Sequence, residues 1–233
     1  MRISFGVTPV IHHFVVAMNP TKTIVLFERG VNGWQSVFGD WKNWPNQAIA
    51  WTVKEKHLPS QTLLYFTSFL FAGWTRPHRS LQFSRLIRQY SVDDWDIVIV
   101  AHSEGTATAI EAMRLAGWPR ISAVHLICGA CDSNFERNGL NYALVTNKVG
   151  KVVCWTADND MAMKFEDTLL GLLMFGIAWN DCPLGLSGPK NVRQQFLDNG
   201  RVTEKHWQDY GHSTCWTDYH FDQTMRGIFD NTP

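Results

Sequence analysis

Four runs of consecutive apolar residues stand out along the chain, each bounded by polar or turn-forming residues. Runs of this length without alternation are typical of strands buried on both faces of a parallel sheet. They lie at residues 23–27, 96–101, 123–128 and 151–156. A fifth strand is predicted at 62–66, and segments 3–7 and 14–17 are predicted to form an opening hairpin.

Two segments between these strands have helical spacing. Residues 80–90 place Leu81, Ile87 and Tyr90 among basic residues, and residues 106–115 are rich in alanine and other helix formers. Buried strands that alternate with helices predict an α/β fold, with a compact, mostly parallel central sheet flanked by helices. The chain shows no internal repeat, low-complexity tract or linker, so residues 1–233 are expected to form one domain.

The segment 161–190 differs from the rest of the chain. It is longer than one crossover helix needs, and residues 169–175 are almost entirely apolar before a loop rich in proline and glycine. One interpretation is a helix buried against the sheet. The other is a small helical cap whose apolar face contacts a substrate.

Composition and charge exclude several classes of protein. Hydrophobic residues make up 45% of the 233 positions and charged residues 18%, which is typical of a packed globule. Lys plus Arg and Asp plus Glu both number 21, so neither nucleic-acid binding nor electrostatic membrane docking is indicated. No apolar run reaches the ~18 residues that a membrane span needs. The N-terminal 20 residues do not have the pattern of a signal peptide, so we expect a cytoplasmic protein.

The five cysteines are an odd number and lie mostly in apolar surroundings, which favours a reducing compartment and buried thiols. Cys128 and Cys131 form a C-x-x-C pair that is compatible with redox chemistry or with half of a zinc site. No second pair follows at zinc-ligand spacing, so we expect no metal.

The strand at 96–101 leads directly into a candidate catalytic segment, Ala101-His102-Ser103-Glu104-Gly105. An alanine-rich helix follows. A serine at a tight turn between a strand and a helix needs small residues two positions away on either side. Ala101 and Gly105 meet that need. The alternative is a serine that only caps the helix.

This segment resembles the nucleophile elbow of the α/β-hydrolase family, G-x-S-x-G, with Ala101 in place of the first glycine. In that family an acid and then a histidine follow the serine along the chain. Asp160, after the strand at 151–156, matches the family's acid turn, and the pair Gly211-His212 looks like its histidine loop. The resemblance implies a catalytic triad of Ser103, Asp160 and His212.

Several residues compete for these roles. Asp158 is the acid if the turn is shifted in register, and Asp132 is the acid if it follows the preceding strand. His206 and His220 are the alternatives to His212, which the neighbouring glycine favours.

The resemblance also implies an oxyanion hole made of two backbone N–H groups, those of Glu104 and Val31. Arg29 replaces the family's usual histidine, and it either contacts an anionic substrate or forms a salt bridge within the loop. Trp34 and His102 are predicted to line the substrate pocket. Trp34 belongs to a cluster with Trp41, Trp44 and Trp51, for which core packing is the alternative.

The function implied is hydrolysis of an ester-type bond, in a carboxylic ester or thioester, through an acyl-enzyme on Ser103. It needs no cofactor, and the expected partner is a small-molecule ester or acyl substrate. The motifs do not distinguish an esterase from a lipase, thioesterase or peptidase. Two alternatives are an acyltransferase and a catalytically inactive binding protein, the latter because Ala101 and Glu104 depart from the usual elbow.

Overall fold

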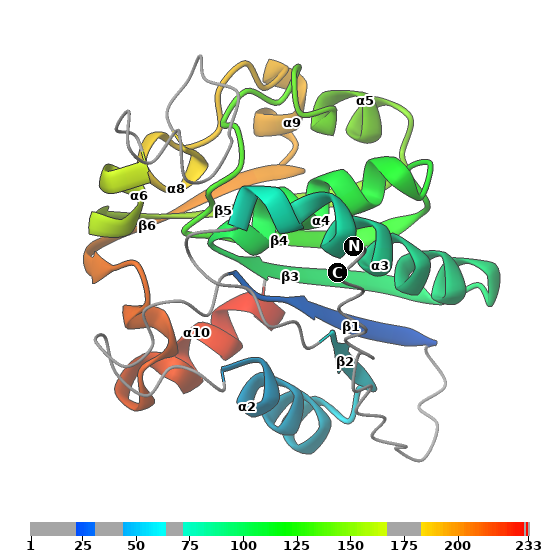
Figure 1. Ribbon diagram of the computed structural model, residues 1–233, viewed down its shortest axis with the longest axis horizontal. Helices are drawn as coiled ribbons and strands as arrows, with labels where there is room; N and C mark the ends of the chain where they lie inside the picture. Colours follow the sequence, from blue (N-terminus) through cyan, green and yellow to red (C-terminus); the bar gives the residue numbers. More distant parts are fainter. Residues whose placement is uncertain (1–21, 31–43, 64–71, 167–182, 231, 233) are drawn as a thin grey trace, which may run out of the picture.

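Six parallel strands form one sheet at the centre of the computed structural model (Figure 1). The structure describes residues 22–30, 44–63, 72–166, 183–230 and 232. The strand order across the sheet is β2-β1-β3-β4-β5-β6, with every neighbouring pair parallel. The strands are β1 (Thr23–Glu28), β2 (Ser60–Thr62), β3 (Asp96–His102), β4 (Ile121–Ile127), β5 (Val149–Asn159) and β6 (Val202–Gly211).

The four strands predicted from continuous apolar runs are present as β1, β3, β4 and β5, with ends that differ by up to three residues. The weaker prediction at 62–66 is displaced, because β2 ends at Thr62 and residues 64–66 lie outside the described part. The predicted hairpin in segments 3–7 and 14–17 also lies outside it. β6 was not predicted, because this strand at the sheet edge has many exposed residues and lacks a continuous apolar run.

Helices connect the strands in the described part of the chain and cover both faces of the sheet (Figure 1). Their bounds are α2 (Trp44–Trp51), the π-helical turn η2 (Thr52–Lys56), α3 (Ala72–Val92), α4 (Glu104–Leu115), α5 (Leu140–Val145), α6 (Met161–Glu166), α8 (Leu184–Ser187), α9 (Gln194–Asp198), the 3₁₀ turn η4 (Thr214–Trp216) and α10 (Asp218–Asp230). The helix predicted at 106–115 is α4. The helix predicted at 80–90 is longer than expected, since α3 begins at Ala72 and continues through Pro77.

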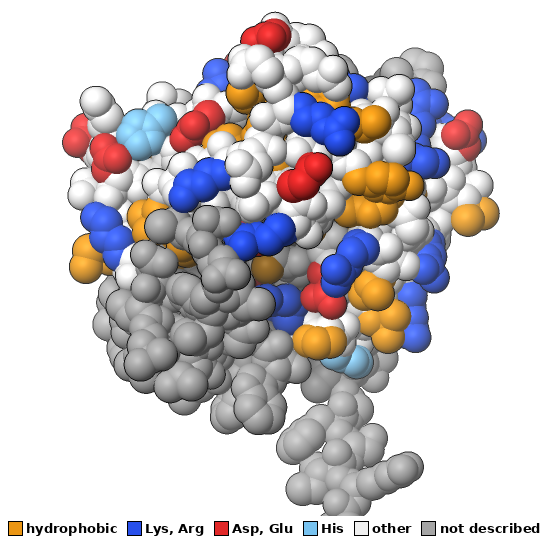
Figure 2. Space-filling model, turned by 90° about the horizontal axis from the view of Figure 1, so that it is seen from above, with side chains coloured by type: hydrophobic (Ala, Val, Ile, Leu, Met, Phe, Trp, Pro, Cys, Tyr) orange, Lys and Arg blue, Asp and Glu red, His pale blue; other side chains and the backbone are white. Residues whose placement is uncertain are grey.

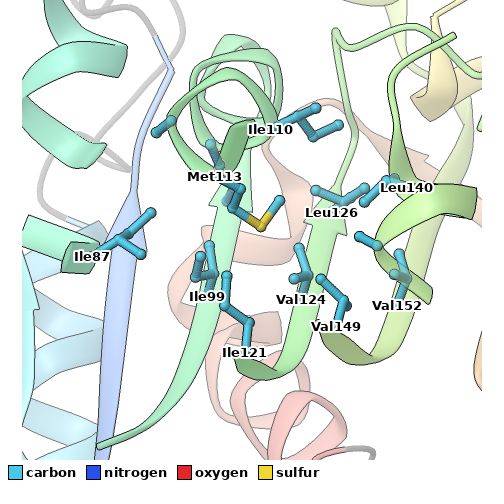
Figure 3. Packing of buried hydrophobic residues seen from close by; sticks show 14 of the residues in the cluster. Ile87, Ile99, Ile110, Met113, Ile121, Val124, Leu126, Leu140, Val149 and Val152 are labelled. Carbon is cyan, nitrogen blue, oxygen red and sulfur yellow. The ribbon is translucent and has the colours of Figure 1, made fainter. Parts of the chain in front are cut away.

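Alternate residues of the strands point to two separate hydrophobic clusters. On β3, Ile97 and Ile99 face the cluster formed with α3, α4, α5 and α9. Figure 3 shows this cluster, in which side chains from α3 and α4 meet those of β3, β4 and β5. Val98 and Val100 face the other cluster, formed with α2, η4 and α10. The continuous apolar runs arise because both faces of the central strands are covered.

Segment 161–190 is described only at its two ends. α6 follows β5, and α8 packs against the end of β4, where the Gly185 N–H donates to the Gly129 carbonyl at 2.8 Å and Leu184 is buried. The C-terminal end of the segment therefore belongs to the core. Residues 167–182 lie outside the described part, so the cap and the buried helix both stay predictions.

The surface shown in Figure 2 carries Lys and Arg side chains interspersed with Asp and Glu, and hydrophobic side chains singly or in small groups. Among the helices described, we find none with the length and apolar character needed to cross a bilayer.

Candidate active site

Ser103 lies at the sharp turn between β3 and α4. Its backbone angles, φ 57° and ψ −134°, are rarely adopted by a residue other than glycine. The turn is held by its backbone, because the Ser103 N–H donates to the Ile127 carbonyl and the Thr106 N–H donates to the Ser103 carbonyl, both at 3.0 Å. Ala101 is fully buried. The small residues predicted around the serine therefore lie in a turn of the predicted kind.

Two glycines allow neighbouring segments to approach this turn. A Cβ on Gly105 would lie 2.5 Å from the carbonyl oxygen of Glu28, so only glycine fits between the turn and the end of β1. A Cβ on Gly30 would lie 2.8 Å from Ser103 Cβ, 3.0 Å from Ser103 Oγ and 3.2 Å from the Glu104 backbone nitrogen. The loop after β1 thus touches both the serine and the backbone nitrogen predicted to bind an oxyanion. Val31, the other predicted donor, lies outside the described residues, as does Trp34.

Asp160 and His212 lie together at the carboxyl ends of β5 and β6. Asp160 Oδ2 is 2.9 Å from His212 Nδ1, and Asp160 Oδ1 accepts the Met163 N–H at 2.9 Å. The pairing of β5 with β6 is irregular between Ala157 and Asn159: Ala157 pairs with Trp207, Asn159 pairs with Gly211, and the extra residues bulge out of β6. The register after this bulge places Asp160 and His212 next to each other.

The environment of Asp160 favours its charged form. Burial alone raises the pKa of this fully buried carboxyl, but the charge and hydrogen bond of His212 and the Met163 N–H outweigh burial. The pKa of Asp160 is therefore held below its usual value, and the carboxylate is available to orient the imidazole.

The competing residues are engaged elsewhere. Asp158 Oδ1 lies 3.2 Å from His206 Nε2 in a largely exposed pair, and His220 Nδ1 lies 2.6 Å from the Tyr210 hydroxyl. Asp132 forms an ion pair with Arg137. The structure thus brings Asp160 and His212 together and gives the alternatives other partners.

His102 was predicted to line the substrate pocket, but its ring lies in the protein interior. The ring is 1% exposed and makes edge contacts with Trp44 and Trp216. Its Nε2 lies 2.8 Å from the His212 carbonyl oxygen. Trp44 and Trp216 stack at 4.0 Å in the core, which agrees with the packing alternative for Trp44. Trp41 lies outside the described residues.

A charged cluster that the sequence analysis did not predict lies behind the turn. Glu104 is buried and accepts hydrogen bonds from Arg76 at 2.6 and 2.9 Å and from Arg79 at 3.1 Å. Arg79 also reaches within 3.9 Å of the buried Glu28. The two arginines neutralise the carboxylate beside the Glu104 backbone N–H. The available signal was their three-residue spacing, which places both on one face of α3.

Glu28 and Arg29 both have altered pKa values. Burial raises the pKa of Glu28 to about 8, against the lowering effect of Arg79 and Arg29. Burial lowers the pKa of Arg29, while the neighbouring Glu28 raises it. Glu28 is therefore an electrostatic neighbour of Arg29 inside the protein, and contact between Arg29 and a substrate stays a prediction.

Metal-binding side chains gather at one place in the described part, where ligand atoms of His102, Cys128 and His212 lie within 4.8 Å of one another. The hydrogen bonds above engage nitrogens of both rings. A hydrogen bond to Cys215, burial and the Asp160 carboxylate raise the pKa of the Cys128 thiol well above its usual value. The group is thus held as a hydrogen-bonded network around Asp160. Cys128, Cys131, Cys154 and Cys215 are all buried free thiols.

Comparison with known proteins identifies the fold. No family model and no curated protein matches this sequence. Among solved structures, the chain is similar to esterase PE8, with 11% identity, a TM-score of 0.54 and coverage of 96% of this chain and 99% of that one. It is also similar to the butyrate-bound esterase Est2 of Thermogutta terrifontis, with 13% identity, a TM-score of 0.56 and coverage of 97% and 89%.

A third similar structure is a predicted CIB-like hydrolase of Thermoplasma acidophilum, with 10% identity, a TM-score of 0.52 and coverage of 96% and 99%. These matches extend over almost the whole chain. Together with the all-parallel sheet and its order, they show that this chain has the α/β-hydrolase fold.

Proposed function

We propose that this protein is a serine hydrolase that cleaves an ester-type bond, in a carboxylic ester or a thioester. The observation that carries the proposal is that Ser103 lies on a strained turn close to His212 in the fold. The residue before Ser103, His102, contacts the backbone of His212. His212 is paired with the buried Asp160. Serine, imidazole and carboxylate thus lie on connected segments at the carboxyl edge of the sheet.

The proposed reaction has two halves. Ser103 Oγ attacks the carbonyl carbon while His212 takes the hydroxyl proton, because a serine hydroxyl is a weak nucleophile without a base. His212 then gives this proton to the leaving alcohol or thiol, which leaves an acyl-enzyme. Water, deprotonated by His212, then attacks the acyl carbon. The bond to Ser103 Oγ breaks, His212 returns the proton to Oγ, and the carboxylic acid leaves. Asp160 holds the imidazole tautomer and stabilises the imidazolium.

The developing negative charge on the carbonyl oxygen needs donors that are already in place. We assign one donor to the Glu104 N–H, at the first turn of α4, where backbone N–H groups have no partner within the helix. The second is the Val31 N–H, by the resemblance to the family. Arg76 and Arg79 support this assignment, because they offset the charge that the Glu104 carboxylate would otherwise place beside the oxyanion.

The test combines turnover with covalent labelling. We expect hydrolysis of p-nitrophenyl acetate, butyrate or octanoate, and labelling by a fluorophosphonate probe that is lost in Ser103→Ala. Asp160→Asn is expected to lower kcat by roughly 10⁴-fold, since the amide favours the wrong histidine tautomer. Asp158→Asn is the matched control and should retain activity, because Asp158 pairs with His206.

Folded protein that neither labels nor turns over any of these esters would contradict the proposal and favour a binding protein. Product analysis with added alcohols or amines separates hydrolysis from acyl transfer.

A further inference from the structure

His102 is the last residue of β3 and directly precedes Ser103. Its Nε2 lies 2.8 Å from the carbonyl oxygen of His212, and the two imidazole ring centroids are 4.8 Å apart. The residues are separated by 110 positions in the chain. A hydrogen bond thus joins the strand that carries the proposed nucleophile to the loop that carries the proposed base.

The hydrogen bond between His102 and His212 shows which nitrogen of His102 carries the proton. A carbonyl oxygen only accepts hydrogen bonds, so Nε2 of His102 must carry a proton. Burial and the neighbouring His212 lower the pKa of His102 to about 3, so the ring is neutral at neutral pH. Trp44 and Trp216 contact the ring at centroid distances of 5.9 and 5.8 Å and restrict its rotation.

We propose that His102 is a positioning residue, which holds the backbone of His212, the proposed base, in a fixed place relative to Ser103. The inference rests on the proposed function and extends it beyond the triad. Asp160 fixes only the ring of His212, through Nδ1. The His102 hydrogen bond holds the same residue at its backbone carbonyl oxygen. Because the anchor is next to Ser103 in sequence, nucleophile and base share one rigid support.

The first arm of the test replaces the donor. His102→Leu removes it and leaves the His212 carbonyl without its partner, whereas the amide nitrogen of His102→Gln reaches the place of Nε2. His125→Leu is the matched control. His125 is a fully buried histidine on the adjacent β4, and its Nε2 lies 3.1 Å from Thr232 Oγ1, away from His212.

We expect kcat for p-nitrophenyl butyrate to fall by roughly 10–100-fold in His102→Leu, with KM nearly unchanged, because a misplaced base slows the chemical step more than binding. His102→Gln should recover most of this loss, and His125→Leu should keep the wild-type kcat. A wild-type kcat in His102→Leu overturns the proposal, and so does an equal loss in the two leucine variants.

The second arm does not depend on turnover. In wild-type protein with ¹⁵N-labelled histidine, NMR should show His102 protonated on Nε2 alone from pH 5 to 8. The His212 Nδ1–H signal should persist in His102→Gln and broaden or vanish in His102→Leu. A His102 that titrates in this range, or that carries its proton on Nδ1, overturns the proposal even if His102→Leu does not fold. Wild-type protein without turnover or labelling refutes the proposed function, and these spectra still decide the role of His102.

Discussion

The backbone of Ser103 is strained, since its left-handed φ costs a non-glycine residue on the order of 1–3 kcal/mol. The surrounding structure maintains this conformation through the backbone hydrogen bonds to Ile127 and from Thr106. Gly105 allows the turn to pack directly on the end of β1. Strain held in this way is typical of residues whose exact position matters for function.

Gly30→Ala tests the packing of the β1 loop on this turn. The new methyl group would lie 2.8 Å from Ser103 Cβ, 3.0 Å from Oγ and 3.2 Å from the Glu104 nitrogen, so the serine or the loop must move. We expect kcat/KM for p-nitrophenyl butyrate to fall about 10²-fold, because displacement of reacting groups by a fraction of an ångström to an ångström has effects of that size.

Gly211→Ala is the control for this substitution. Its Cβ would lie no closer than 3.4 Å to any neighbour, which is ordinary van der Waals contact. Activity should stay close to that of the wild type. Equal activity of the two alanine variants would show that the loop does not constrain the serine.

At the scale of secondary structure, ion pairs as well as apolar packing connect α3 to the start of α4, next to Ser103. Phe83 and Ile87 lie in the hydrophobic cluster beneath the helix. One turn or more before them, Arg79 forms an ion pair with Glu104 of α4 and lies 3.9 Å from the carboxyl group of Glu28 in β1. A buried charge of this kind is tolerated only while its partners remain.

Arg79→Met should therefore be strongly destabilising. It removes a 2% exposed cation and leaves the buried Glu104 with Arg76 alone. We expect the free energy of unfolding to fall by about 3–5 kcal/mol, as measured by urea denaturation at neutral pH.

Arg226→Met is the matched control, because Arg226 forms an exposed pair with Asp222 within one helix. Exposed pairs contribute little to stability, so its urea midpoint should not change measurably. If the two methionine variants unfold at the same midpoint, the cluster behind the elbow is not structural.

At the scale of the whole molecule, three buried titratable groups make stability depend on pH. The pKa of Glu28 is about 8 in the folded protein, against 4.5 when exposed. Between these values the folded state keeps a proton that the unfolded state has lost, so stability falls as pH rises. The pKa values of His102 and His125 are about 3, against 6.5. In that window the unfolded state binds the extra protons, so stability rises with pH.

The opposing trends predict a maximum of stability near pH 6.5. Each group contributes a slope of roughly 1.4 kcal/mol per pH unit within its window. Below the maximum, the rising contribution of the two histidines to stability exceeds the falling contribution of Glu28. Above the maximum, only Glu28 contributes a slope. Urea denaturation from pH 4.5 to 8.5 measures this profile. Glu28→Gln should abolish the decline above pH 6.5, and His125→Gln should flatten the acid side. An unchanged alkaline slope in Glu28→Gln would refute the assignment to Glu28.

The sequence by itself determined the fold class and most of the central strands. Strands covered on both faces need continuous apolar runs, and such runs are visible without a structure. The tight turn at Ser103 was also predictable, because small residues must flank a serine in such a turn. β6 was not, since an edge strand with one neighbour tolerates the polar pattern that hides it.

Only the tertiary structure decided which polar residues meet. The sequence favoured Asp160 over Asp158 only by its match to a family turn, whereas in the structure the register of β5 against the bulged β6 brings Asp160 to His212 and Asp158 to His206. The ion pairs of Arg76 and Arg79 with Glu104 span more than twenty positions, and the bond between His102 and His212 spans 110. A charged or polar side chain can be buried only where a partner compensates its lost hydration. That partner is set by the packing of distant segments, which no local pattern specifies.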